Sequence, residues 1–215
     1  AGLTQGPDGA SHQSLEDIAL MRALPNMVVV SPADEIETRQ ATFAVADWPG
    51  PVYMRLGRYP VPCVSSGAGA FEIGKARILR EGRDLVLFAA GHMVCKALDA
   101  AEILARDRLE ARVVNVSTIK PLDAETVRRA AGDVALAVSV EEHSVIGGLG
   151  GAIAECLSGQ AGAPRLLRLG VQDRFGESGL ADELLEKYRL TGQGIAADIR
   201  EALAGSGTAP STHSA

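Results

Sequence analysis

The sequence has few cysteines, few aromatic residues and no long apolar run. Its three cysteines, Cys63, Cys95 and Cys156, lie far apart and form no CxxC or Cys/His cluster, which indicates neither a disulfide framework nor a zinc site. Aromatic residues make up 4% of the chain, which disfavours stacking of nucleic-acid bases on an open surface. No stretch approaches the roughly 20 apolar residues of a membrane helix, and no secretory signal is recognisable. The sequence therefore predicts a cytoplasmic protein with reduced thiols and no membrane partner.

A concentrated basic surface is also missing. The 215 residues include 21 Lys and Arg against 27 Asp and Glu, a net charge of −6, and no stretch gathers the basic residues into a stripe. We therefore expect no nucleic-acid partner, because binding to a phosphate backbone requires such a stripe. Hydrophobic residues make up 47% of the chain, and a chain of this length can bury a sizeable core in one or two domains.

Residues 83–204 show a regular alternation of strands and helices. Apolar runs at 85–91, 111–116, 134–140 and 166–169 predict buried strands, and apolar residues at helical spacing separate them. Short connections in such an alternation predict a mostly parallel sheet with helices on both faces. The expected fold class is therefore α/β.

The preceding residues are organised differently. Residues 1–58 alternate helix and strand but contain too few strands to enclose a core, so they resemble the second half of a domain. Residues 59–82 are rich in Pro, Gly and Ser and predict a linker with a small β element. Residues 205–215 are small and polar, and we expect a disordered tail there.

Two serines are expected to start helices in the first part. Ser14 is followed by Asp17 three residues later, which predicts a capping box. Ser31 is followed by Pro32 and Asp34, which places a cap, a first-turn proline and a favourable charge at a second helix start.

The loop Asp8–Gln13 and two arginines are the main candidates for a site. The imidazole of His12 could hydrogen-bond or exchange protons with a substrate oxygen, and Asp8 could bind a hydroxyl. Arg55 and Arg58 follow a strand, where ligands of parallel α/β sheets bind, and an arginine there suits a phosphate. From spacing alone, an ordinary polar loop and two surface arginines remain alternatives.

Three further features favour structural roles. The glycine-rich turn Gly147–Gly151 opens a helix and could bind an anion, but tight strand–helix packing explains it equally well. Adjacent residues of a strand point to opposite faces, so Glu141, Glu142 and His143 do not converge, and we expect a structural or interface role. His92 follows a glycine at a helix start and is expected to be a surface or capping residue with a satisfied partner.

Ordered motifs along nearly the whole chain resemble the transketolase family, most closely the small subunits of split transketolases. The motifs are DGASHQ (8–13), SLEDIALMRALPNMVVVSPAD (14–34), GPVYMRLGR (50–58), TIKPLD (118–123), EEHSVIGGLGGAIAE (141–155) and VQDRFGESG (171–179). The resemblance implies that residues 1–58 are the second half of a pyrimidine-binding domain and that 83–204 are a transketolase C-terminal domain.

The resemblance also implies an activity, which is the transfer of a two-carbon ketol unit between sugar phosphates on thiamine diphosphate. His12 matches the family histidine that contacts the substrate beside the cofactor. Asp8 matches the aspartate that binds a substrate hydroxyl. Arg58 aligns best with the arginine for the sugar phosphate, and Arg55 is a second substrate-binding candidate that related synthases share.

Other parts of the family's site are not in this chain. The catalytic Glu and the aromatic pocket lie upstream of DGxxHQ, so we expect a chain truncated at its N-terminus and inactive alone. The diphosphate and Mg²⁺ belong to another domain, which a large N-terminal subunit carries in split enzymes. The implied partners are that subunit, in a homo-oligomer or heterotetramer, and sugar phosphates.

Two alternatives remain. One is the beta subunit of an oxo-acid dehydrogenase or a deoxyxylulose phosphate synthase, which share the two-domain plan. The other is a non-catalytic module that only forms dimers or docks the large subunit. The motifs DGASHQ and DRFGESG (173–179) favour transketolase over the first alternative.

Overall fold

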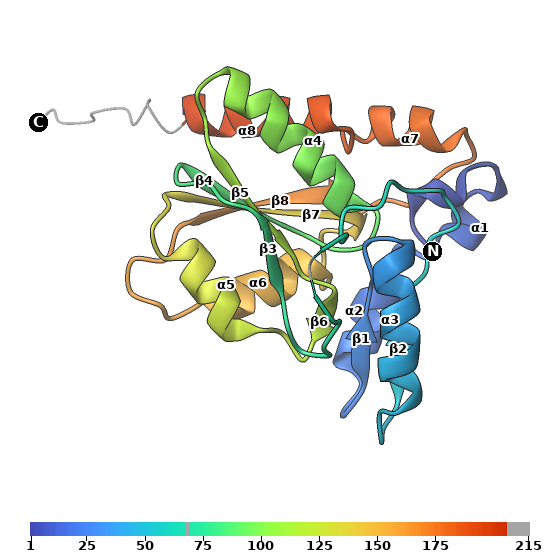
Figure 1. Cartoon of the computed structure of the whole chain (residues 1–215). Helices are drawn as coiled ribbons and strands as arrows, with labels where there is room; N and C mark the ends of the chain where they lie inside the picture. The colour runs from blue at the N-terminus through green and yellow to red at the C-terminus, as the bar shows by residue number, and fades with distance from the viewer. Residues whose placement is uncertain (68, 206–215) are drawn as a thin grey trace, which may run out of the picture.

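The computed structural model describes residues 1–67 and 69–205. Most of the expected tail, residues 206–215, lies outside the described residues, and its first residue, Gly205, ends a helix. In the described part of the chain, no helix is both long and apolar enough to cross a membrane. The elements are arranged around two sheets, a larger one and a smaller one at the N-terminal side (Figure 1).

Within the described residues, the larger sheet has five strands in the order β3-β5-β4-β7-β8. They are β3 (Arg77–Arg80), β4 (Leu85–Ala89), β5 (Ala111–Asn115), β7 (Leu136–Ser144) and β8 (Arg165–Val171). All neighbours pair in parallel except β3 with β5. The mostly parallel α/β sheet predicted from the sequence is confirmed. The strand β3 lies in the segment expected to be a linker, and it extends this sheet.

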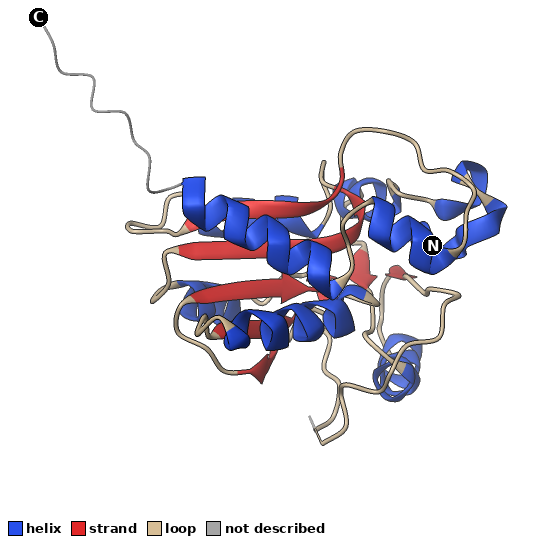
Figure 2. Ribbon diagram, turned by 90° about the horizontal axis from the view of Figure 1, so that it is seen from above, coloured by secondary structure: helices blue, strands red, loops and turns tan. Residues whose placement is uncertain are grey.

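Helices cover both faces of the larger sheet (Figures 1 and 2). One face carries α4 (Met93–Arg106), α7 (Ala181–Lys187) and α8 (Gly192–Gly205), and the other carries α5 (Ala124–Ala131) and α6 (Leu149–Leu157). The central strand β4 is completely buried, and alternate side chains enter the two cores: Leu87 packs on the α4 side and Phe88 on the α6 side. This double burial explains why β4 is a continuous apolar run in the sequence.

The smaller sheet joins the two parts of the chain. It consists of β1 (Val28–Val30) between β2 (Val52–Met54), which is parallel to it, and β6 (Thr118–Lys120), which is antiparallel. Around it lie a 3₁₀ segment, η1 (Leu3–Asp8), and the helices α1 (Ala10–Gln13), α2 (Asp17–Ala23) and α3 (Glu35–Ala46). Because β6 belongs to the C-terminal part of the chain, residues 1–58 do not complete this sheet alone.

Both helix starts predicted from serines are wrong. Ser14 has a left-handed backbone (φ 50°) and ends α1, and α2 begins three residues later at Asp17. Ser31 lies four residues before α3, and its N–H donates to Ser117 O while its carbonyl accepts from Gly91 N. The cap of α3 is instead Asp34, whose carboxylate accepts from Glu37 N at 2.9 Å.

Asp34 also ties the segment after β2 to α3. Its carboxylate accepts from Val64 N (2.7 Å), Ser65 N (2.6 Å) and Ser65 Oγ (2.6 Å). Burial would raise the pKa of Asp34, but these hydrogen bonds and the one from Glu37 outweigh burial and hold its pKa below the ordinary 3.8. The stabilisation is therefore present above that pH and is lost as the pH falls through the lowered pKa.

We expect Asp34→Ala to lower the free energy of unfolding by about 2–3 kcal/mol at neutral pH, because a helix cap and three further hydrogen bonds are lost. The difference from wild type should shrink in acid, as the pH falls below 3.8 and through the lowered pKa of Asp34. Urea unfolding at neutral pH and in acid measures it. Asp47→Ala, at the exposed other end of α3, is the matched control and should change stability little. An equal, pH-independent loss in both variants would contradict the assignment.

Candidate functional site

The segment from Gly2 to Gln13 forms a closed loop that carries two predicted site residues. Gly2 N donates to Gln13 O at 2.6 Å and closes the loop. Asp8 ends η1 and His12 lies in α1, and both side chains are exposed. His12 Nδ1 lies 3.0 Å from the hydroxyl of the adjacent residue Ser11.

Arg58 joins this loop from the segment after β2. Its Nη1 donates to Asp8 Oδ2 at 2.7 Å, and both side chains remain well exposed to solvent. An exposed ion pair contributes only about 0–1 kcal/mol, so an incoming anion could replace Asp8 on Arg58 at small cost. The structure thus brings Asp8 and Arg58 together, with His12 in the same loop as Asp8.

Arg55 is not part of this group. It is 6% exposed, and its Nε donates to Asp17 Oδ2 at 2.8 Å while Nη2 donates to the backbone oxygen of Glu142 at 3.2 Å. Tyr53 donates its hydroxyl proton to the same Asp17 oxygen at 2.7 Å. These partners hold Arg55 in the interface between the two parts of the chain, an arrangement that favours a structural role.

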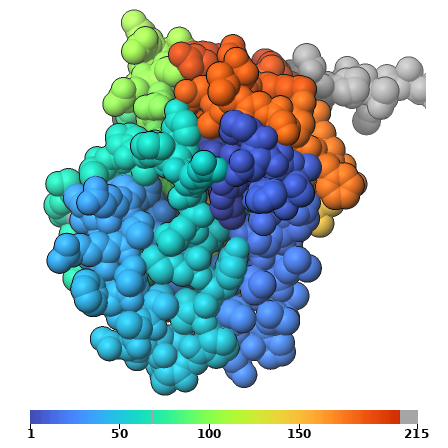
Figure 3. Space-filling view, turned by 90° about the vertical axis from the view of Figure 1, so that its right-hand side faces the viewer, coloured from blue at the N-terminus to red at the C-terminus, as the bar shows by residue number. Residues whose placement is uncertain are grey.

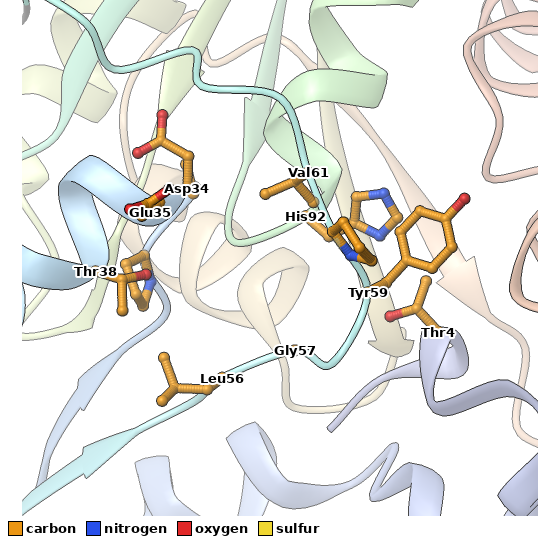
Figure 4. A pocket seen from close by; sticks show the side chains of 12 residues that line it. Thr4, Asp34, Glu35, Thr38, Leu56, Gly57, Tyr59, Val61 and His92 are labelled. Atoms are coloured by element: carbon orange, nitrogen blue, oxygen red, sulfur yellow. The ribbon is translucent and has the colours of Figure 1, made fainter.

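A cavity of about 350 Å³ lies next to the loop. It is bounded by residues that follow the carboxyl ends of β1, β2 and β4, where ligands of parallel sheets bind. In Figure 4, Thr4, Tyr59 and His92 lie on one side of it, and Glu35 and Thr38 lie on the other. Gly57 and Tyr59, which flank Arg58 in sequence, both line the cavity.

His92 is buried in the wall of this cavity, which corrects the expectation of a surface or capping residue with a satisfied partner. Its ring stacks on Tyr59 with centroids 5.3 Å apart, and Tyr59 donates to Asp182 at 2.7 Å. Among the described residues, nothing hydrogen-bonds to the buried Nδ1 atom of His92. Burial lowers the pKa of His92, so the neutral imidazole is favoured.

The anion site considered at the glycine-rich turn is filled by the chain's own carboxylate. At the start of α6, Leu149 N and Gly150 N donate to Glu141 at 2.6 and 2.9 Å. Burial raises the pKa of Glu141 to about 7, although the two amides act in the opposite direction. A Cβ on Gly148 would lie 2.0 Å from Glu141, so close packing on this carboxylate explains a glycine there.

The other two residues of the Glu141–His143 run lie at the interface between the two parts of the chain. His143 Nδ1 donates to Ser144 O at 2.6 Å, and its Nε2 accepts from Ala19 N at 3.4 Å. Burial lowers the pKa of His143. Glu142 lies between Glu141 and His143 in the sequence, and its carboxylate accepts hydrogen bonds from Thr4. Sequence reasoning missed this link between Glu142 and Thr4, since no local pattern indicates it.

The described residues do not form a site for a divalent metal. Among residues 1–67 and 69–205, no group of three or more His, Cys, Asp or Glu side chains is arranged to hold a metal ion. The side chains at the loop, Asp8, His12 and Arg58, are suited to hydrogen bonding and to one anionic group.

Comparison with known proteins places these residues in a family. The family model of the transketolase pyrimidine-binding domain matches residues 1–62, and that of the transketolase C-terminal domain matches residues 74–195. A Methanocaldococcus jannaschii protein, provisionally named a transketolase C-terminal section, is 47% identical over 203 residues, 94% of this chain and 63% of that protein. A subunit of the apulose-4-phosphate transketolase of Phocaeicola vulgatus is 40% identical over 195 residues, 90% of this chain and 62% of that protein.

A solved structure of a split-gene transketolase, described as an inactive β4 tetramer, is 47% identical with a TM-score of 0.86 and covers 91% of this chain and 64% of that one. Synthases of 1-deoxy-D-xylulose 5-phosphate are also similar, at 37–41% identity, but the chain spans only 30–32% of their length. The chain spans less than two thirds of the length of the two transketolase relatives. With both domain models matched in order, the chain belongs to the transketolase family.

Proposed function

We propose that this chain forms the substrate-binding side of the active site of a transketolase, which moves a two-carbon ketol unit from a ketose phosphate to an aldose. The observation that carries the proposal is the exposed Asp8–Arg58 pair in contact with the loop of His12. Transketolase-family proteins generally use thiamine diphosphate. We assign Asp8, His12 and Arg58 to the substrate alone.

Each of the three side chains has a distinct role in the proposal. The guanidinium of Arg58 can bind two phosphate oxygens at once. A phosphate bound there displaces Asp8, and the freed carboxylate then accepts a hydrogen bond from a sugar hydroxyl. His12 hydrogen-bonds to a reacting substrate oxygen and exchanges a proton with it. The adjoining cavity gives room for the carbon chain of the substrate.

The proposal also includes a partner that holds the diphosphate and its metal. We propose a large N-terminal subunit that binds thiamine diphosphate and Mg²⁺, in a heterotetramer or another oligomer with this chain. The Phocaeicola vulgatus relative, which is named as one subunit of its enzyme, and the split-gene protein support a two-subunit arrangement.

The direct test is an assay of the assembled enzyme with thiamine diphosphate and Mg²⁺. We expect a ketose phosphate and an aldose phosphate to exchange two carbons, with no loss of carbon dioxide. Consumption of an oxo acid with release of carbon dioxide would instead favour the synthase or dehydrogenase reading. A stable complex without either reaction would favour the docking module.

Arg58→Ala should raise KM for a phosphorylated aldose about 10- to 150-fold, the equivalent of about 1.5–3 kcal/mol for hydrogen bonds to a charged group. KM for the same aldose without phosphate should stay near the wild-type value, because Arg58 contacts only the phosphate. Arg39→Ala, which removes an exposed arginine of α3, controls for net charge. An equal change for both aldoses would remove Arg58 from the phosphate site.

A further inference from the structure

The loop that carries Asp8 and His12 rests on the C-terminal part of the chain. Figure 3 shows the N-terminal segment, in dark blue, against residues around α7, in orange. Two groups of residues within this contact hydrogen-bond to the loop and pack closely on it: Glu142 near the end of β7, and the segment 176–179 before α7. We call these two groups the loop bed.

Glu142 holds the beginning of the loop. Its Oε2 accepts from Thr4 Oγ1 at 2.8 Å and from Thr4 N at 3.2 Å, and the side chain is 4% exposed. Gly2 also lies directly against Glu142, since a Cβ on Gly2 would be 2.3 Å from the carboxyl carbon. Gly2 has φ 96°, so this close approach needs a glycine for both space and backbone conformation.

The segment 176–179 holds the part of the loop next to the site residues. Gln13, which follows His12, donates from Nε2 to Glu177 O at 2.8 Å. A Cβ on Gly176 would lie 1.7 Å from Gln13 Oε1, and a Cβ on Gly9 would lie 2.5 Å from Ser178 Oγ. Gly9 separates Asp8 from α1, so both site residues sit on backbone that is packed closely against this segment.

One arginine links Glu142 of the loop bed to the helix that follows the loop. Arg55 Nη1 lies 3.9 Å from Glu142 Oε1, and its Nε donates to Asp17, the first residue of α2, four residues after Gln13. All three side chains are buried. Arg55 therefore holds the start of α2 close to Glu142, because separating these charges in a region that water does not reach is costly.

We propose that Glu142 is a positioning residue: with the rest of the loop bed, it sets the place of Asp8 and His12 relative to Arg58. Glu142 touches no substrate and acts through Thr4. Its effect on activity rests on the proposed function, in which a displacement of about 1 Å can cost about 10²-fold in rate. The C-terminal part of the chain thereby contributes to the placement of Asp8 and His12.

Hydrogen exchange of the full chain tests whether the loop bed holds the loop, and it does not depend on an activity assay. In Glu142→Ala, the amides of residues 2–13 should exchange about tenfold faster, because the acceptor of Thr4 is lost, while β4 stays protected. Thr4→Val should give the same local change from the other side of the contact. Glu142→Gln keeps an acceptor for Thr4 and should restore most of the protection. Glu155→Ala, an exposed carboxylate on α6, is the control and should leave the loop unchanged.

Kinetics of the assembled enzyme test the positioning role. Glu142→Ala should lower kcat about 10²-fold per folded molecule, with a smaller change in KM, and Glu142→Gln should recover most of kcat. Unchanged exchange of residues 2–13 in both Glu142→Ala and Thr4→Val would show that the loop bed does not hold the loop. Faster exchange with unchanged kcat would overturn the positioning role. If the wild-type assembly transfers no ketol unit, the proposed function fails, and the exchange result still decides whether Glu142 holds the loop.

Discussion

Arg55→Met is expected to lower the free energy of unfolding by about 3–5 kcal/mol, because it leaves buried charge without its partner. Asp17 would keep the hydroxyl of Tyr53, with His143 Nε2 3.8 Å away, and Glu142 would lose its nearest cation. All of these groups lie at the contact between the N-terminal and C-terminal parts of the chain. We therefore expect the substitution to weaken the contact between these two parts. Urea unfolding of the whole chain measures the loss of stability.

The matched variant is Arg58→Met, which removes the other predicted arginine. Its pair with Asp8 is exposed, so the expected loss is at most about 1 kcal/mol. The two variants separate a structural arginine from one available to a ligand. If Arg55→Met unfolded at the same urea concentration as wild type, Arg55 would be free to bind a substrate, as its position after a strand suggested.

The C-terminal part of the fold could be predicted because local pattern and long-range structure agree there. The strand β4 is apolar at every position and is covered on both faces, so a continuous apolar run was enough to identify it. Asp123 caps α5, and its side chain accepts from Thr126 N at the start of that helix.

The N-terminal helix starts could not be predicted because distant contacts override the local signals. Ser31 has a good capping side chain, yet its backbone pairs with Ser117 and Gly91, which are far away in sequence. Leu15 likewise accepts from Ser144 N at 2.8 Å, which keeps the residue after Ser14 out of a helix. No local pattern shows these partners.

Distant contacts also decide which of the candidate site residues are buried and which are exposed. The loop of Asp8 and His12 was recognisable as a motif, and the resemblance favoured Arg58 for the phosphate but left Arg55 as a second substrate-binding candidate. Arg55 is buried because Asp17 and Glu142, 38 and 87 positions away, come together around it. Arg58, three residues later in the sequence, pairs only with the exposed Asp8 among the described acidic residues and stays exposed.

His12→Ala is expected to reduce kcat about 10²–10⁴-fold in the assembled enzyme, the usual contribution of a positioned acid–base group. His12 is exposed and its ring contacts the neighbouring Ser11 hydroxyl. The substitution should therefore leave the unfolding midpoint and the exchange of residues 2–13 unchanged. A loss of rate cannot then be attributed to a displaced loop.

The most direct test of the proposed site is the rate of two-carbon transfer by the assembled enzyme carrying His12→Ala, compared with wild type at saturating ketose phosphate. We expect a fall in kcat of at least about 10²-fold with the fold intact. A kcat equal to that of wild type would show that His12 and its loop do not act on the substrate, and it would contradict the proposed site.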